Sequence, residues 1–339
     1  MMVIRPVKMD DLDNIVTLAS KTGTGLTTLP HSRIHLKAKI EDSLAAFDKS
    51  DGEPMDECYL FVLEDTETGE VVGTSGVVAA VGTRQPFYTY KMNTEVHYSK
   101  SMDIYRKLNF LTLTNDFTGA SEICTLFLSP DFRGGGNGPL LSKSRFLFMA
   151  QFPGRFGDRV VAEMRGYSDE NGQSPFWECV GRHFFGVDFA VADKENGEGN
   201  NQFIAELMPH HPVYVPMLSA EAQKVLGEVH PQTLPAVQML YGEGFRKTGY
   251  VDIFDGGPTI ETPVEEVRTI KESFVLDITI GEMETTGVTN AIISNTRLQQ
   301  FRATLAKLPP PEGYKITVSQ ELADALLLKD GESVRVRYY

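Results

Sequence analysis

The segment from Cys124 to Ala150 restricts the fold of this 339-residue chain more than any other stretch. An apolar run from Cys124 to Leu128 predicts a buried strand, and apolar residues from Leu140 to Ala150 recur at helical spacing. Between them lies a glycine-rich turn, Arg133 to Gly138, whose consecutive glycines allow backbone N–H groups to point inward. The positive end of the following helix dipole lies at the same place. The segment therefore predicts a strand, a loop and a helix that bind an anion, with phosphate as the expected ligand.

The spacing of the glycines narrows the kind of phosphate site. No Gly-Lys-Ser/Thr follows them, and the dinucleotide pattern Gly-x-Gly-x-x-Gly is not matched. The loop does match Arg/Gln-x-x-Gly-x-Gly, through Arg133, Gly136 and Gly138. With the strand before it, this pattern resembles the acyl-CoA pyrophosphate loop of the GNAT acyltransferases. The alternative is a purely structural turn, because glycine turns between strands and helices are common.

Charge and composition exclude several classes of protein. A formal net charge of −14 without a basic stripe argues against a nucleic-acid surface. No run approaches 18 apolar residues and the N-terminus lacks the pattern of a signal peptide, so we expect no membrane partner and a cytoplasmic location. Cys58, Cys124 and Cys179 lie far apart without metal-ligand spacing, which predicts reduced thiols and no metal site.

The first part of the chain predicts an α+β unit of the GNAT type. A strand from Val3 to Pro6 and a helix from Met9 to Ala19 open it, and a polar loop covers Lys21 to Pro30. A second helix is predicted to bury one apolar face, formed by Ile34, Leu36, Ile40, Leu44 and Phe47. A hairpin and an insertion rich in aromatic residues, at 82–121, precede the phosphate-binding segment.

The later part of the chain predicts three further features. Residues Ser174 to Phe185 are expected to form the last helix and strand of the acyltransferase core, with Trp177 where related proteins usually have a tyrosine that acts as an acid. Lys194 to Asn201 is a polar break, and AVQMLYGEGF suggests a degenerate second GNAT-like unit. We therefore expect a GNAT domain at 1–193, a second GNAT-like segment at 194–263 and a small β-rich C-terminal module at 264–339.

A closer resemblance runs through the whole chain. The following motifs occur in the order found in the arginine N-succinyltransferases of bacteria: MVIRPV, KTGTGLTTLP, CTLFLSP, SKSRFLFMA, VVAEMRG, SPFW, FIAELMP, VHPQT, GEGF and YVDIFDGGPT. The resemblance implies transfer of a succinyl group from succinyl-CoA to the α-amino group of L-arginine, the first step of arginine catabolism by the succinyltransferase pathway. It implies succinyl-CoA as a cosubstrate, no permanently bound cofactor, and a homo-oligomer or a pair with a paralogous subunit.

The donor site is expected around the phosphate-binding segment. In a GNAT fold the strand offers backbone N–H groups to the thioester and to the pantetheine arm, which pairs with it almost as an added strand. The expected donor-binding residues are Leu126, Phe127, Leu128, Arg133, Gly134, Gly135, Gly136, Asn137 and Gly138.

His230 is the expected proton donor to the CoA thiolate. The resemblance implies this role for the histidine of VHPQT, and a histidine exchanges protons near neutral pH. Pro231 places His230 at the entrance of a helix, so a solvated helix cap is the alternative interpretation.

The acceptor pocket requires carboxylates for a guanidinium and cations or donors for an α-carboxylate. Candidates for the first are Glu163, Asp252 and Asp255, and candidates for the second are Lys21, Thr22 and Thr24. Each of the three acidic residues also has an ordinary structural or surface interpretation.

Two other functions fit the same residues. One is a succinyltransferase that prefers ornithine or another cationic amino acid. The other is a noncatalytic partner subunit that binds CoA without releasing a thiol, although the intact loop and His230 argue against it.

Overall fold

A computed structural model describes residues 1–22, 28–50, 52–197, 202–209, 211–283 and 286–339 of the chain. The strands are β1 (Met2–Pro6), β2 (Cys58–Asp65), β3 (Val71–Val78), β4 (Thr89–Ser99), β5 (Ile104–Thr114), β6 (Ser121–Leu128), β7 (Arg159–Glu163), β8 (Val213–Tyr214), β9 (Arg246–Val251), β10 (Pro258–Pro263), β11 (Phe274–Ile280), β12 (Thr289–Asn295), β13 (Ala303–Leu308), β14 (Lys315–Val318) and β15 (Ser333–Tyr338).

The α-helices are α1 (Leu12–Ser20), α2 (Arg33–Asp48), α3 (Asn137–Gln151), α4 (Pro175–Cys179), α5 (Gly181–Phe185), α6 (Phe189–Gly197), α7 (Gln202–Leu207), α8 (Ala220–Val225), α9 (Leu234–Gly242), α10 (Arg268–Glu272) and α11 (Gln320–Ala325). Single 3₁₀ turns are η1 (Met9–Asp11), η2 (Pro130–Phe132), η3 (Pro153–Arg155), η4 (Val215–Met217), η5 (Pro231–Thr233) and η6 (Val264–Glu266). Each helix in these ranges is too short or too polar to traverse a lipid bilayer.

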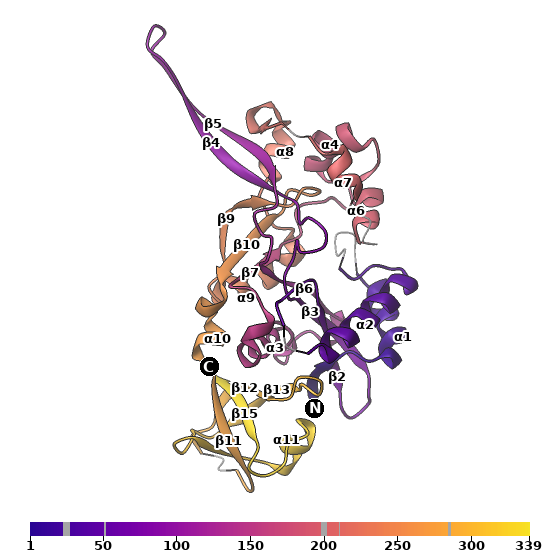
Figure 1. Cartoon of the computed structure of the whole chain (residues 1–339), viewed down its shortest axis with the longest axis vertical. Coiled ribbons are helices and arrows are strands. Elements are labelled where there is room, and N and C mark those ends of the chain that lie inside the picture. The colour runs from indigo at the N-terminus through magenta and orange to yellow at the C-terminus, as the bar shows by residue number, and fades with distance from the viewer. Residues whose placement is uncertain (23–27, 51, 198–201, 210, 284–285) are drawn as a thin grey trace.

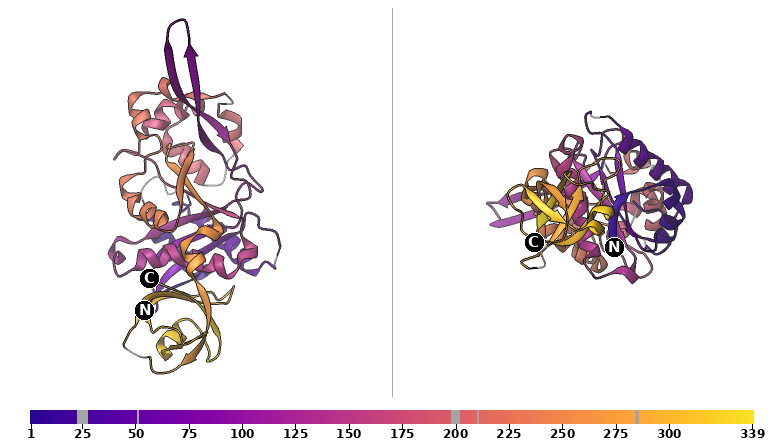
Figure 2. Two further views of the ribbon diagram at one scale, coloured as in Figure 1. Left: turned by 90° about the vertical axis from the view of Figure 1, so that its left-hand side faces the viewer. Right: turned by 90° about the horizontal axis from the view of Figure 1, so that it is seen from below.

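One mixed sheet connects the described strands in the order β14-β11-β15-β12-β13-β1-β2-β3-β6-β7-β10-β9-β4-β5-β8. The molecule is elongated, with the C-terminal strands and α11 at one end and the β4–β5 hairpin at the other (Figures 1 and 2). Strands β1, β2, β3 and β6 are antiparallel, whereas β7 lies parallel to β6. The mixed sheet and its helices give the expected α+β content.

The site is positioned by the place at which β6 and β7 move apart. Their register pairs only Ser121 with Val160 and Glu122 with Val161, although β6 continues to Leu128. The strands therefore diverge beyond Glu122, and one edge of β6 is left without a neighbouring strand in the described part of the chain.

Helices cover both faces of this part of the sheet. Buried residues of α1 and α2 pack with β2 and β3 in one apolar cluster, and α3 packs on the opposite face. Leu36, Ile40 and Phe47 are buried as predicted, but Ile34 is 80% exposed. Its assignment to the apolar face is wrong because residues two apart on a helix point roughly 200° away from each other.

The structure corrects two predictions after β7. Residues Ser174 to Phe185 contain two short helices, α4 and α5, and no strand. The Ser174 side chain caps α4, and a Cβ at Gly181 would lie 2.1 Å from the Trp177 ring, so close packing of these helices requires this glycine. The predicted break at Lys194 begins inside α6, which runs to Gly197; residues 198–201 lie outside the described ranges.

The segment 194–263 extends the sheet of the first part of the chain. Strand β10 pairs with β7 and with β9, and α9 precedes β9 as the predicted helix-to-strand ending. These strands continue the existing sheet and do not form a sheet of their own. The division into domains at 193 and 263 stays a prediction, as does the second GNAT-like unit.

The C-terminal elements match their predicted type and order. Strand β13 joins them to the sheet through the pair Ile4 and Ala303. Alternate residues of β12 and β13 face different cores: Ile292 and Ala303 pack with α3, whereas Ile293 and Leu308 pack inside the module. The module thus supports α3 from below (Figure 2).

Candidate active site

Strand β6 carries a bulge at the place where it leaves β7. Thr125 has a positive φ of 53°, and the pairing of β6 with β3 shifts register between Thr74 and Gly76. The Thr74 hydroxyl donates to the carbonyl of Thr125 at 2.9 Å, and the Thr125 N–H donates to the Thr28 hydroxyl at 3.1 Å. The bulge fixes the part of β6 that follows, Leu126 to Leu128, at the gap between the strands, where the donor-binding backbone was predicted.

The glycine loop follows directly after β6. Gly134, Gly135 and Gly136 all have positive φ, between 59° and 102°, which explains the run of three glycines. Gly136 caps α3, so the helix begins at Asn137 inside the predicted loop and three residues before the predicted start. A Cβ at Gly136 would lie 2.5 Å from a methyl carbon of Leu305 on β13, so the loop packs against the C-terminal module.

The remaining predicted loop residues lie around this turn. Arg133 is exposed, and a Cβ at Gly138 would meet no described atom within 4 Å. The Asn137 amide donates to the carbonyl of Phe132 at 3.0 Å, which closes the turn at the helix start. The Asn137 N–H donates to the Gly134 carbonyl at 3.1 Å and Pro139 has no N–H, so the Gly138 N–H is the donor of this first turn without an acceptor among the described residues.

The three predicted ligands for an α-carboxylate have different surroundings. The Lys21 ammonium lies 3.3 Å from the Ser129 hydroxyl and 3.9 Å from a carboxylate oxygen of Asp131, beside the start of the glycine loop. The Thr22 hydroxyl donates to the carbonyl of Ala19. Thr24 lies outside the described residues. Lys21 is thus brought to the expected phosphate side of the site.

An acidic cluster lies at the separation of β6 and β7. We use this name for Glu122 on β6, Glu163 on β7, and Asp252 and Asp255 in the turn between β9 and β10. Burial raises the pKa of Glu163 well above its usual range, and the charges of Asp252, Glu122 and Asp255 add to the effect. Burial also raises the pKa of Glu122 to about 8. The Lys39 ammonium partly offsets this effect on Glu122.

The alternation along the two strands decides which face the cluster occupies. Ile123, Ala162 and Met164 pack into the core formed with α3. Because successive strand residues point to opposite faces, Glu122 and Glu163 point to the other face. This is the face that α1 and α2 cover further along the sheet.

Asp252 and Asp255 hold the turn that carries them. One oxygen of Asp252 accepts from the backbone N–H groups of Phe254 and Asp255, at 2.7 and 2.8 Å. Asp255 accepts from the N–H groups of Gly166 and Gly257, at 2.6 and 2.8 Å. Their side chains thus tie the turn to the end of β7, and burial raises the pKa of both. The Glu163 side chain, in contrast to its backbone on β7, has no hydrogen bond among the described residues.

His230 lies beside the residue that follows β7. Its N–H donates to the carbonyl of Arg165 at 2.9 Å, and Val229 bridges to Gly166. The ring Nδ1 accepts from the Gln232 N–H at 3.2 Å and so caps η5. Burial, and then the charge of Arg165, lower the pKa of His230, against a hydrogen bond with the Ser168 backbone. The neutral imidazole is therefore favoured near pH 7, and it must gain a proton before it can donate one.

Trp177 does not belong to this site. It is fully buried, stacks on Phe254 with ring centroids 5.6 Å apart, and donates its indole N–H to the carbonyl of Val187 at 3.1 Å. The residue at the expected tyrosine position is therefore a core residue.

Sequence reasoning missed Glu122 and Arg165. Both are charged residues at or inside strand-like apolar runs, SEICTLFL and VVAEMR. A charge on a predicted buried strand was the available signal, because such a charge requires a partner or a function. The described residues contain no group of three or more His, Cys, Asp or Glu side chains arranged to hold a metal ion.

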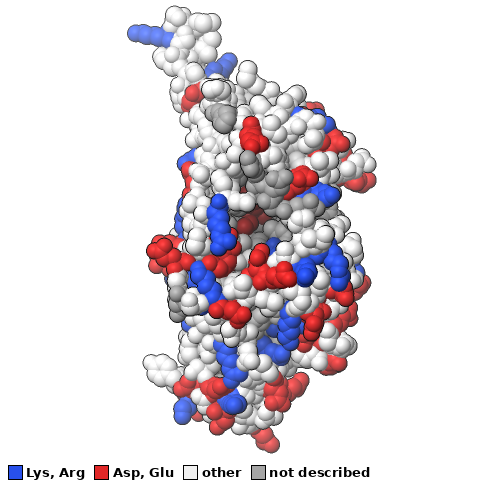
Figure 3. All heavy atoms as spheres, turned by 45° about the vertical axis from the view of Figure 1, so that its right-hand side comes forward, with Lys and Arg blue, Asp and Glu red and all other residues white. Residues whose placement is uncertain are grey.

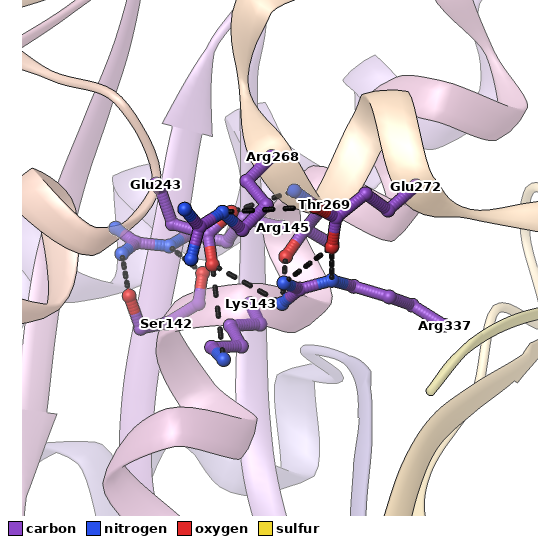
Figure 4. Close-up of polar contacts among 8 residues, drawn as sticks. All are labelled: Ser142, Lys143, Arg145, Glu243, Arg268, Thr269, Glu272 and Arg337. Carbon is purple, nitrogen blue, oxygen red and sulfur yellow. Dashed lines mark hydrogen bonds and ion pairs between the residues drawn. The ribbon is translucent and has the colours of Figure 1, made fainter. Parts of the chain in front are cut away.

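A second set of buried charges lies on the other side of α3, and we call it the docking network. Glu243, at the end of α9, and Arg337, on β15, are only 2% and 4% exposed and lie 3.4 Å apart (Figure 4). Glu243 also accepts from the Thr269 N–H at 2.7 Å and faces the Lys143 ammonium of α3 at 3.7 Å. Arg337 also donates to Glu272 at 2.9 Å. The network ties the phosphate-binding helix to α10 and the C-terminus.

The outer surface gives no sign of a nucleic-acid site on the face that Figure 3 presents, where acidic and basic side chains are interspersed. The charge on this face therefore does not single out a polyanion as a ligand.

Comparison with known proteins covers the whole chain. The model of the arginine N-succinyltransferase beta subunit matches residues 2–269, and that of the C-terminal domain of this beta subunit matches residues 272–337. An arginine N-succinyltransferase from Escherichia coli (strain 55989 / EAEC) is 48% identical over 336 residues, which cover 99% of this chain and 97% of the relative. One from Shigella flexneri gives the same values.

A solved structure has the same fold over its full length. The arginine/ornithine succinyltransferase subunit AI from Pseudomonas aeruginosa superimposes with a TM-score of 0.91 at 39% sequence identity, and the match covers 100% of this chain and 98% of that one.

Proposed function

The chain belongs to the arginine N-succinyltransferase family, and we propose that it transfers the succinyl group of succinyl-CoA to the α-amino group of L-arginine. The products are CoA and N2-succinyl-L-arginine, and the reaction opens the succinyltransferase pathway of arginine catabolism. The observation that carries the choice of a cationic acceptor is Glu163 of the acidic cluster, beside the open edge of β6, since the charges that shift its pKa are all carboxylates.

The donor binds along β6 and at the start of α3. Leu126 to Leu128 offer main-chain groups to the pantetheine arm and the thioester, and the loop from Arg133 to Gly138 receives the pyrophosphate. The positive φ values of the loop and the Gly138 N–H at the start of α3 support this assignment. Lys21, beside Ser129, adds a cation on the phosphate side.

The acceptor binds on the face of the sheet that carries Glu122 and Glu163. Glu163 is the main partner of the guanidinium, because its side chain has no hydrogen bond among the described residues and the charges around it are carboxylates. Asp252 and Asp255 act through the charge that they add and through the turn that they hold.

Two groups move protons. Glu122, with a pKa of about 8, takes a proton from the incoming ammonium group so that the amine can attack the thioester. After the attack, the nitrogen of the former amine carries a surplus proton. The neutral imidazole of His230 accepts this proton and passes it to the departing CoA thiolate. The lowered pKa of His230 supports this order of events.

Product analysis tests the function. Purified protein with succinyl-CoA and L-arginine should release one thiol for each N2-succinyl-L-arginine formed. A thiol reagent measures the released CoA, and mass spectrometry measures the succinylarginine. Thiol release without succinylarginine, or no reaction at all, would overturn the proposal.

Ornithine is a second candidate acceptor. The Pseudomonas relative is described as an arginine/ornithine succinyltransferase, and buried carboxylates bind an ammonium as well as a guanidinium. The kcat/KM values for arginine and ornithine with succinyl-CoA decide between them, and a higher value for ornithine would replace our choice.

We also propose that the chain assembles with a second copy of itself through the β4–β5 hairpin. This hairpin projects from the molecule (Figure 1), and beyond Tyr90 and Lys91 on β4 and Phe110 and Leu111 on β5 its outer edges pair with no described strand. Tyr98 and Tyr105, opposite each other, are 62% and 59% exposed. An isolated two-stranded ribbon has little stability of its own in water.

Charge favours a second copy as the partner. The hairpin carries four basic and two acidic side chains, whereas the chain has a net charge of −14. Light scattering should give a dimer or larger assembly for the wild type and a smaller species for a Tyr98→Ser/Tyr105→Ser variant. Tyr314→Ser, at a tyrosine that is 84% exposed, is the control. A monomeric wild type, or an unchanged variant assembly, would contradict the proposal.

A further inference from the structure

Arg165 has hydrogen-bonding capacity that the described residues do not use. Its Nη2 donates to the Ser168 hydroxyl at 3.2 Å, while its Nε is buried and has no acceptor. A guanidinium has five N–H donors in a planar fork, and buried donors are normally satisfied. The unused donors of Arg165 therefore need an acceptor from outside the described chain.

The neighbouring carboxylates do not fill this role. Asp255 and Asp193 contribute negative charge near Arg165 and so partly offset its burial. Both oxygens of Asp255, however, already accept from the backbone N–H groups of Gly166 and Gly257. No ion pair to Arg165 occurs within 4 Å in the ranges that the structure describes.

Arg165 occupies the reacting end of the proposed site. It lies two residues beyond Glu163, the last residue of β7, and its backbone carbonyl accepts from the N–H of His230 at 2.9 Å. Its charge acts on the His230 ring, and the charge of Asp255 in the acidic cluster acts on it, so the guanidinium lies near both. A planar anion bound there would be held close to the acyl group and the amine.

We propose that Arg165 binds a carboxylate of a reactant and thereby selects substrates that carry one. The inference rests on the proposed function, in which both reactants have such a group: the free end of the succinyl chain and the α-carboxylate of arginine. A guanidinium fork suits a carboxylate because it can donate two parallel hydrogen bonds. Arg165 would then reject acyl donors or amines that lack the carboxylate, since its buried donors would stay unpaired.

Binding measurements on matched ligands test the inference. The variants are Arg165→Gln, Arg165→Lys and, as a control at the start of β7, Arg159→Gln, whose guanidinium already donates to Glu261 and to the carbonyl of Asp116. The ligand pairs are succinyl-CoA with acetyl-CoA, and L-arginine with agmatine, each differing by a carboxylate. Dissociation or competitive inhibition constants are measured, so that slow turnover of an analogue does not matter.

Arg165→Gln should weaken the carboxylate-bearing member of one pair by about 10- to 100-fold and leave its analogue unchanged. Arg165→Lys should recover part of the loss. A change confined to the acyl-CoA pair assigns the site to the succinyl end, and a change confined to the amine pair assigns it to the α-carboxylate.

An equal loss for both members of each pair, with a lowered melting temperature, would show a purely structural arginine and overturn the inference. So would unchanged binding of all four ligands. Wild-type product formation separates this failure from failure of the proposed function: an active wild type with no selective loss in Arg165→Gln refutes only the role of Arg165.

Discussion

The two buried sets of charges differ in how they are paired. In the docking network, Glu243 faces Lys143 and Arg337 and accepts from a backbone N–H, and Arg337 reaches a second carboxylate, Glu272. In the acidic cluster, Glu163 has only other carboxylates among the charges that shift its pKa, and they raise it. Both sets lie close to elements of the same acyltransferase core.

This difference distinguishes buried charges that stabilise the fold from buried charges that serve a function. A buried charge with complete partners stabilises one arrangement of helices and strands, because removing either partner leaves the other unpaired. A buried charge without partners weakens the fold unless a ligand supplies them, and such groups concentrate at functional sites. On our proposal, the acidic cluster and Arg165 are the part of the molecule that a cationic, carboxylate-bearing substrate completes.

The largest effect is expected at His230. His230→Ala should lower kcat by about 10²- to 10⁴-fold, since it removes the group that carries the proton to the thiolate. CoA binding and the melting temperature should remain near those of the wild type, because the side chain contributes one weak cap to η5. Steady-state kinetics with a CoA-binding titration check this, and unchanged turnover would show that His230 is only a helix cap.

Removing a partner from the docking network should act on stability alone. Glu243→Gln leaves Arg337 buried with one carboxylate fewer, and the free energy of unfolding should fall by about 3–5 kcal/mol. Denaturant unfolding measures this loss. The folded fraction should keep the wild-type KM for arginine. A raised KM with unchanged stability would show that Glu243 serves substrate binding and not the stability of the fold.

The opposite result is expected in the acidic cluster. Glu163→Gln should raise the KM for arginine by about 10- to 100-fold, because it removes the main charged partner of the guanidinium. Its melting temperature should be equal to or above that of the wild type. Glu261→Gln is the matched control on the neighbouring strand, where the carboxylate already pairs with Arg159.

The smallest effect is a pH dependence of stability. The pKa of Glu122 is about 8 in the folded chain and near its ordinary value when unfolded. The unfolded chain thus loses this proton first as the pH rises, so stability should fall between about pH 4.5 and pH 8. In unfolding measurements at several pH values, Glu122→Gln should reduce the dependence of the free energy of unfolding on pH. An unchanged dependence would show that another group is responsible for it.

Much of the fold follows from local patterns in the sequence. The strand, glycine loop and helix at 121–151 and the strands of the C-terminal module have clear periodicity, and their predicted type is confirmed. The strand predicted before Phe185 is wrong, because Gly181 permits tight packing of two helices on Trp177, a tertiary contact that propensity does not encode.

The site was only partly predictable. Glycines that require positive φ are visible in the sequence, whereas the meeting of Glu122 with Glu163 depends on where two parallel strands separate. The role of Asp255 in tying its turn to Gly166 depends on residues 89 positions apart. No local pattern reports such long-range pairing.

Proton release on ligand binding tests the central claim most directly. Titration calorimetry at pH 7 in buffers of different ionisation enthalpy counts the protons released when 4-guanidinobutyrate, which has a guanidinium but no α-amine, binds. A cluster that holds its protons until a cation arrives should release roughly one proton per ligand, and Glu163→Gln should release fewer. Binding without proton release, or equal release in the variant, would contradict the account.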